Sequence, residues 1–271
     1  MRYFKIEKHL KINGLLVILW MLLAGNAFAA GPGIEVVNYY AMILHWAGIH
    51  DHHVVHEWLP TIAAVVTLLI ITGIGLVYRA KVLASSDDVR PEHRFGIRTF
   101  VEGILDFVYS LGEDIIGANE VKNFFGLLTG LFLFIFISNL SGLVPGFPPA
   151  TESLNTNLAM GLVVFLMYNI AGIKEHGKSY VKQFLGPIWW LAPLLVGIEL
   201  VAHLARPVSL SLRLYGNIFG DHLVMSVFTG LTYIVLPAFL LFFGLLVAIV
   251  QSFVFTLLSS IYISMAISHD H

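Results

Sequence analysis

The chain has 271 residues, of which 58% are hydrophobic and only 12% are charged, and its mean hydropathy is +0.84. Because a soluble domain carries about 25% charged residues, this composition excludes an ordinary soluble protein and indicates a polytopic membrane protein. The absence of cysteine excludes disulfide bonds and thiol chemistry, whereas the net charge of −2 excludes no class, because the placement of the charges matters more.

The N-terminus has the pattern of a secretory signal. A basic front is followed by a short apolar core at residues 14–24, and Ala27-Phe28-Ala29 has the small residues of a cleavage site. We therefore expect residues 1–30 to be a signal peptide and residues 31–271 to form a single membrane domain. An uncleaved N-terminal anchor is the alternative, and in both cases Gly31 lies outside the cytoplasm. The basic residues of the front are Arg2, Lys5, Lys8 and Lys11.

A histidine-rich stretch at residues 45–56 follows. Imidazole and carboxylate groups are good metal ligands, but their spacing here fits no sharp metal-binding template. We expect a solvated external segment that responds to pH near neutrality, and no metal site. The residues concerned are His45, His50, Asp51, His52, His53, His56 and Glu57.

Five apolar segments can cross or enter a bilayer, for which about 20 residues suffice. Lys and Arg are concentrated in the loops after the first and third segments and are absent from residues 31–58 and 144–156. The positive-inside rule therefore predicts an external N-terminus, five passages and a cytoplasmic C-terminus. The segments are residues 59–78, 124–143, 157–173, 186–231 and 232–267.

The first cytoplasmic loop contains an amphipathic stretch at residues 99–117. Its apolar residues recur at helical spacing, and acidic residues lie between them. We expect a cytoplasmic helix on the membrane surface, and a helix packed within the loop is the alternative. The apolar positions are Phe100, Ile104, Val108, Leu111 and Ile115, and the acidic ones are Glu102, Asp106, Glu113 and Asp114.

The last two segments are much longer than a straight passage requires. Two long apolar elements joined near Gly230 predict a steeply tilted hairpin. The alternative is that each element is broken into shorter pieces, with the break at Pro207 or Pro237. The predicted fold is therefore an all-α membrane protein with five membrane helices, the last two long and tilted, and one amphipathic helix.

Arg213 lies deep in the fourth segment. A guanidinium group stays charged and is costly in hydrocarbon, yet the nearest acids along the segment are Glu199 and Asp221. At about 1.5 Å per residue they lie roughly 20 Å and 12 Å away along a helix axis. We infer that the counter-charge lies on another protein. A structural charge paired within the bundle is the alternative.

The residues around Arg213 resemble subunit a of the F-type ATP synthase. The stretch from Arg206 to Asn217 reads RPVSLSLRLYGN, and Gln251 and Tyr262 follow in the final segment. Residues 139–145 (NLSGLVP) and 155–157 (NTN) also resemble this family, and the likeness covers essentially the whole mature chain.

The resemblance implies a stator subunit of the bacterial inner membrane that couples proton flow to rotation and ATP synthesis. Arg213 would face a ring of c subunits, each bearing one membrane carboxylate, and the b subunits of the peripheral stalk would be further partners. The resemblance gives no reason to expect a cofactor or a nucleic acid. It also gives roles to Asn217 and Gln251 beside the arginine, and a place in the proton path to Glu199, Asp221, His222 and Tyr262.

One position departs from the family pattern. The family's outer half-channel uses an acid and a histidine from the last two helices, whereas this chain has Asp221-His222 on one segment and Gly244 on the other. The departure suggests that acid and base both lie on one helix.

A purely structural role is the alternative for several of these residues. Arg206 fits a side chain that extends to the cytoplasmic interface, and Glu199 fits an interfacial position. Asn217 and Gln251 also fit ordinary interhelical hydrogen bonding.

Two other classes of protein remain as alternatives. A self-contained transporter typically shows inverted repeats, and we find no convincing internal repeat. An intramembrane enzyme needs a nucleophile with its base, or a metal triad, and none is visible. No phosphate-binding glycine motif, HExxH or GxSxG motif occurs, so we expect no nucleotide site in this chain.

Overall fold

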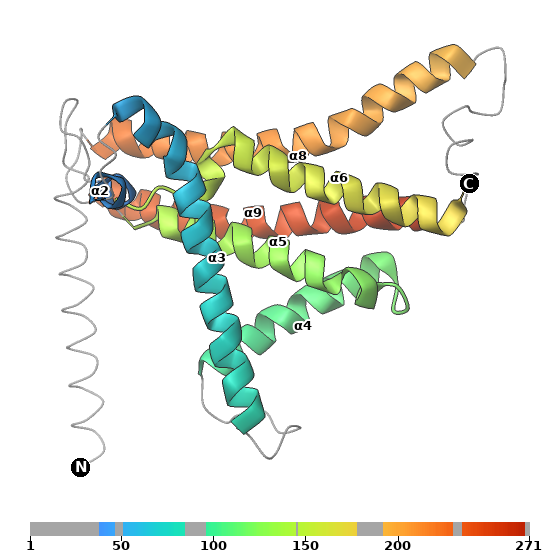
Figure 1. Cartoon of the computed structure of the whole chain (residues 1–271), viewed down its shortest axis with the longest axis horizontal. Coiled ribbons are helices and arrows are strands. Elements are labelled where there is room, and N and C mark those ends of the chain that lie inside the picture. The colour runs from blue at the N-terminus through green and yellow to red at the C-terminus, as the bar shows by residue number, and fades with distance from the viewer. Residues whose placement is uncertain are drawn as a thin grey trace.

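The computed structural model describes residues 38–46, 51–84, 96–144, 146–177, 192–229 and 235–268. The expected signal peptide and the turn near Gly230 lie outside these residues. Every regular element in the described ranges is helical. In chain order (Figure 1) they are α2 (Tyr39–Trp46), α3 (His52–Ala84), α4 (Ile97–Ile116), α5 (Val121–Gly142), the 3₁₀ helix η1 (Ala150–Glu152), α6 (Leu154–His176), α8 (Ala192–Thr229) and α9 (Val235–Ile267).

Five of these helices are long and apolar enough to cross a membrane, which confirms the predicted all-α membrane fold. Many of their large apolar side chains are exposed, among them Leu69 of α3 and Leu166 of α6. Such a surface suits lipid rather than water. The chain is therefore a multi-pass membrane protein. The apolar stretches are Glu57–Ala80, Val121–Gly142, Leu154–His176, Leu194–Met225 and Phe239–Ile267.

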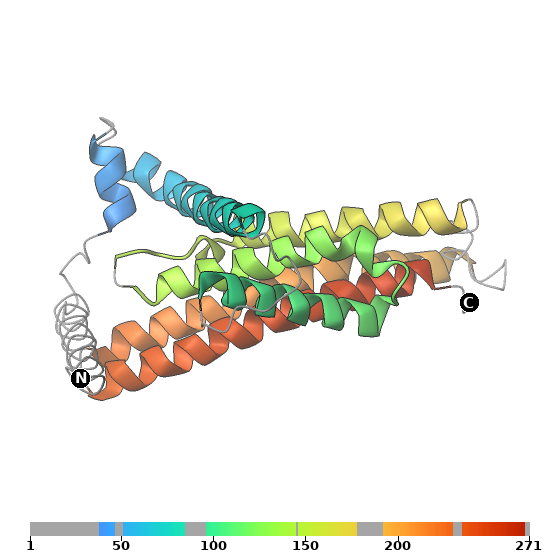
Figure 2. The ribbon, with the colours of Figure 1, turned by 90° about the horizontal axis from the view of Figure 1, so that it is seen from below.

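Four helices, α5, α6, α8 and α9, run side by side and form the bundle (Figure 1). α3 crosses them at a steep angle in Figure 1, and Figure 2 shows it on the side of the bundle away from α9. α8 ends and α9 begins at the same end of the bundle, where α2, η1 and the 143–149 connection also lie. We call this the hairpin end. The C-terminus of α6 and the end of α9 lie at the opposite end.

The lengths of α8 and α9 require a strong tilt in a bilayer. They have 38 and 33 residues, which correspond to about 57 Å and 50 Å at about 1.5 Å per residue. The hydrocarbon core is only about 30 Å thick. α8 continues through Pro207 without a break, and Pro237 lies in the first turn of α9, where proline is tolerated. The alternative of broken segments is therefore wrong for α8.

The amphipathic helix α4 packs against α5 and α9. Val108 is fully buried there, and Ser264 Oγ of α9 donates a hydrogen bond of 2.8 Å to the carbonyl oxygen of Ile115. α4 ends at Gly117, whose φ of 99° suits glycine. α4 thus packs against two membrane helices, and its expected position on the membrane surface remains a prediction.

The core lies between α5, α6, α8 and α9. Large side chains such as Leu128, Val164 and Phe255 fill it. α9 also buries small polar side chains, each of which donates a hydrogen bond to the carbonyl oxygen four residues earlier. Small residues of this kind let membrane helices approach closely. They are Ser252, Thr256, Ser259 and Ser260.

Candidate functional site

Arg213 lies near the middle of α8 and points away from the bundle. Leu210, Leu214 and Ile218, at a spacing of four residues, are buried in the core. Arg213 lies about 100° around the helix from the centre of this buried stripe, on its exposed flank. Arg213 itself is exposed, as is Ser209 one turn before it. No described residue forms an ion pair with its guanidinium group. The structure therefore presents this charge on an otherwise mostly apolar surface.

One turn after Arg213, an amide pair joins the two long helices. Asn217 Nδ2 donates a hydrogen bond of 2.6 Å to Gln251 Oε1, and Gln251 is only 3% exposed. The bond fixes the register between α8 and α9 beside Arg213. Both residues thus form an interhelical hydrogen bond, as one of the two interpretations expected. Their role in ion transport remains a prediction.

A second set of polar residues lies farther from the hairpin end than Arg213 does. His203 Nε2 is 2.9 Å from Asn169 Oδ1 of α6, and its ring contacts that of Tyr168 edge-on at 5.1 Å between centroids. Arg206 lies over the ring of Tyr262, with 5.7 Å between Cζ and the ring centroid, so a cation–π contact holds it. The structure thus packs Arg206 within the protein. Glu199 lies half-buried one turn before His203.

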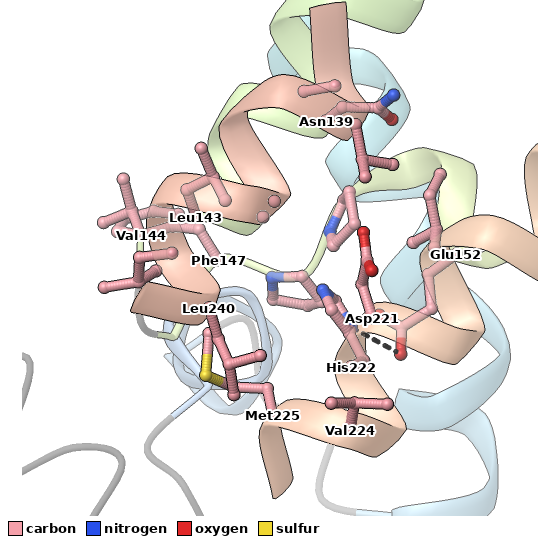
Figure 3. Close-up of a pocket in the computed structure, with 18 of the residues that line it drawn as sticks. Asn139, Leu143, Val144, Phe147, Glu152, Asp221, His222, Val224, Met225 and Leu240 are labelled. Atoms are coloured by element: carbon pink, nitrogen blue, oxygen red, sulfur yellow. Dashed lines mark ion pairs between the residues drawn. The ribbon is translucent and has the colours of Figure 1, made fainter. Parts of the chain in front are cut away.

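Asp221 and His222 line a cavity of about 630 Å³ at the hairpin end. Its walls come from α5, the 143–149 connection, η1, α8 and α9, and most of them are apolar. Figure 3 shows Asp221 and His222 entering this space from α8. Since α8 is continuous, Asp221 stays about 12 Å along its axis from Arg213, and Glu199 about 21 Å on the other side.

Glu152 is a residue of the cavity that the sequence analysis missed. Its Oε1 atom lies 3.2 Å from Nδ1 of His222, so the two form an ion pair when the histidine is protonated (Figure 3). One signal was available: Glu152 is the only titratable residue in the 144–156 loop. Nothing in the sequence indicated that the loop folds back onto α8.

Gly244 lines the same cavity from α9. A Cβ atom added at Gly244 would lie 2.9 Å from Cδ2 of Leu143, the flexible end of a side chain. Among the described lining residues, α9 contributes only glycine and apolar side chains. The suggestion that acid and base both lie on α8 is therefore incomplete, since His222 contacts an acid from η1.

The histidine-rich stretch is only partly described. The residues 47–50 and the side chains of His45, His52, His53 and His56 lie outside the described part of the chain. Within that part, no three His, Cys, Asp or Glu side chains come together as metal ligands.

Residues 61–264 match the family model of the ATP synthase A chain. The chain is 38% identical over 256 residues to ATP synthase subunit a 1 of Syntrophotalea carbinolica, covering 94% of this chain and 98% of that protein.

This chain belongs to the ATP synthase subunit a family. The family expected from the motif around Arg213 is thereby confirmed.

Two further relatives agree. ATP synthase subunit a of Bdellovibrio bacteriovorus is 41% identical over 224 residues, which cover 82% of this chain and 94% of that protein. The Geobacter sulfurreducens subunit a is 44% identical over 176 residues, which cover 65% of this chain and 76% of that protein.

Proposed function

We propose that this chain is the proton-conducting stator subunit of an F-type ATP synthase in a bacterial inner membrane, with Arg213 facing a ring of c subunits. The observation that carries the proposal is the exposure of Arg213 on the surface of α8, without an ion pair among the described residues. A carboxylate on each passing c subunit supplies the missing counter-charge. The b subunits of the peripheral stalk are the second expected partner.

The chemistry follows from the cost of charge in lipid. A c-subunit carboxyl group enters lipid only when it is protonated, because an ionised group there costs several kcal/mol. Beside the guanidinium group its ionised form is favoured. The carboxyl group therefore loses its proton on one side of Arg213 and gains one on the other. Arginine suits this position better than lysine, because a buried lysine can lose its proton.

Titratable residues of α8 on either side of Arg213 carry protons to and from the ring. By the positive-inside assignment, the hairpin end faces outward, so Asp221 and His222 belong to the outer access route and Glu199 to the cytoplasmic one. Arg213 between them prevents protons from passing directly from one route to the other. Ion flow then requires ring rotation, which drives ATP synthesis in partner subunits.

The test is Arg213→Ala in the assembled complex in lipid vesicles. We expect ATP-driven proton pumping to fall by about 100-fold or more, because removing a preorganised charge has effects of that size. Arg79→Ala, which removes an exposed arginine of α3, is the matched control and should pump as the wild type does. Pumping by Arg213→Ala at the wild-type rate would sink the proposal.

A further inference from the structure

We propose that Glu152 and His222 form the proton-accepting pair of the outer access route, with Glu152 supplying the acid that α9 lacks at Gly244. The inference rests on the proposed function and adds to it a residue from outside the two long helices. It starts from the contact of 3.2 Å between Glu152 Oε1 and His222 Nδ1.

Stability alone does not account for this pair. The side chains of His222 and Glu152 are 35% and 38% exposed, and an ion pair in contact with water contributes little to folding. The exposure instead leaves both groups accessible from the cavity. A carboxylate beside an imidazole can receive and release protons when both groups are accessible.

The segment that carries Glu152 is held firmly. Thr151 beside it is fully buried, and its Oγ1 donates a hydrogen bond of 2.7 Å to Asn139 Oδ1 of α5. Asn157 Nδ2 of α6 donates to the carbonyl oxygen of Thr151 at 2.7 Å, and Ser211 Oγ of α8 donates to the carbonyl oxygen of Asn157 at 2.9 Å. This chain of bonds joins η1 to three helices and positions the Glu152 carboxylate opposite α8.

The cavity provides room for water beside the pair. Its volume of about 630 Å³ is far more than a single water molecule requires. Among its described lining residues, Glu152, Asp221 and His222 are the titratable ones, and α5 and α9 contribute none. Figure 3 shows Glu152 and His222 side by side and joined by the ion pair, with Asp221 next to them.

The proton transfer balances without another reactant. A proton from outer water binds the neutral imidazole of His222, and the Glu152 carboxylate stabilises the resulting cation. The proton then passes through cavity water to Asp221 and on to an ionised c-subunit carboxylate. His222 returns to its neutral form, so one proton enters the route for each that leaves it.

The test is Glu152→Gln in the assembled complex in vesicles, with ATP synthesis measured as the pH on the cavity side is varied from about 5 to about 8. We expect the rate per complex to fall about tenfold or more. The fall should persist across this pH range, because the variant lacks the carboxylate at every pH. Glu113→Gln, an exposed acid of α4, is the matched control and should leave the rate and the profile unchanged.

A wild-type rate and pH profile for Glu152→Gln overturns the inference. If that variant assembles poorly, Glu152→Asp decides the question, because it keeps the charge but withdraws the carboxylate by one methylene. A reduced rate per complex then supports the pair, and an unaltered rate and profile overturns it. Arg213→Ala separates the two proposals. If Arg213→Ala loses pumping while Glu152→Gln keeps the wild-type rate and profile, only the inference about Glu152 is wrong. If Arg213→Ala pumps at the wild-type rate, the proposed function is wrong.

Discussion

At the scale of single residues, α8 combines one exposed charge with groups that are paired with residues of α9. Arg206 lies against Tyr262 and Asn217 is bonded to Gln251, whereas Arg213 has no such partner among the described residues. Partnered groups are structurally satisfied. Arg213 is therefore the group for which we propose a counter-charge on a passing c subunit.

Asp221 of α8 and Gly244 of α9, both in the cavity wall, give a prediction at this scale. Asp221→Asn removes a carboxyl group from the cavity, whereas Gly244→Ala adds a methyl group that only a flexible Leu143 side chain must accommodate. We expect Asp221→Asn to slow ATP-driven proton pumping about tenfold or more, and Gly244→Ala to change it less than about twofold. The initial rate of vesicle acidification is the measurement. The reverse order would move the proton route to α9.

At the scale of elements, α6 fixes the position of α8 close to Arg213. Gly161 of α6 lies so near α8 that an added Cβ atom would be 2.5 Å from Ser211 Oγ and 2.8 Å from the carbonyl oxygen of Pro207. Ser211 also bonds the carbonyl oxygen of Asn157. A larger side chain at Gly161 would therefore press on the backbone of α8 at Pro207 and on the side chain of Ser211, two residues from Arg213.

Gly161→Ala should destabilise the protein by about 1–3 kcal/mol, because overpacking strains the helix contact. Gly126→Ala of α5 is the matched control, since nothing lies within 4 Å of its added Cβ atom. The temperature at which the detergent-solubilised complex loses subunits gives the comparison. Equal temperatures for the two variants would show that the α6–α8 contact tolerates a methyl group.

The sequence predicted the elements well for a physical reason. In lipid, apolar length and the placement of charge dominate, so five spans and Arg213 could be read directly. The continuity of α8 through Pro207 could not be read from the sequence, because other contacts can compensate for the backbone N–H donor that proline lacks. The Glu152–His222 contact was also beyond reach, because it depends on how the 144–156 loop folds back. Asn217 and Gln251 were both singled out, but their bond depends on the register of two helices.

At the scale of the whole molecule, the exposed face of α8 should meet a neighbouring subunit. The chain has no cysteine, so an introduced one is unique. Ser209→Cys and Leu212→Cys, both on the exposed face beside Arg213, should form disulfides with cysteines placed near the c-subunit carboxylate. Val65→Cys, exposed on α3, should not. Gel analysis of the oxidised complex reads the result, and crosslinking at Val65 alone would place the ring elsewhere.

The tilt of α8 gives the proposed mechanism a sense of direction. The apolar stretch Leu194–Met225 has 32 residues, or about 48 Å, so crossing about 30 Å of hydrocarbon carries it about 37 Å sideways. Glu199 and Asp221 then differ in their position around the ring as well as in depth. A c subunit passes the two routes in a fixed order, and that order selects clockwise or anticlockwise rotation for a given proton gradient. A hairpin sloping the opposite way would turn the same ring backwards.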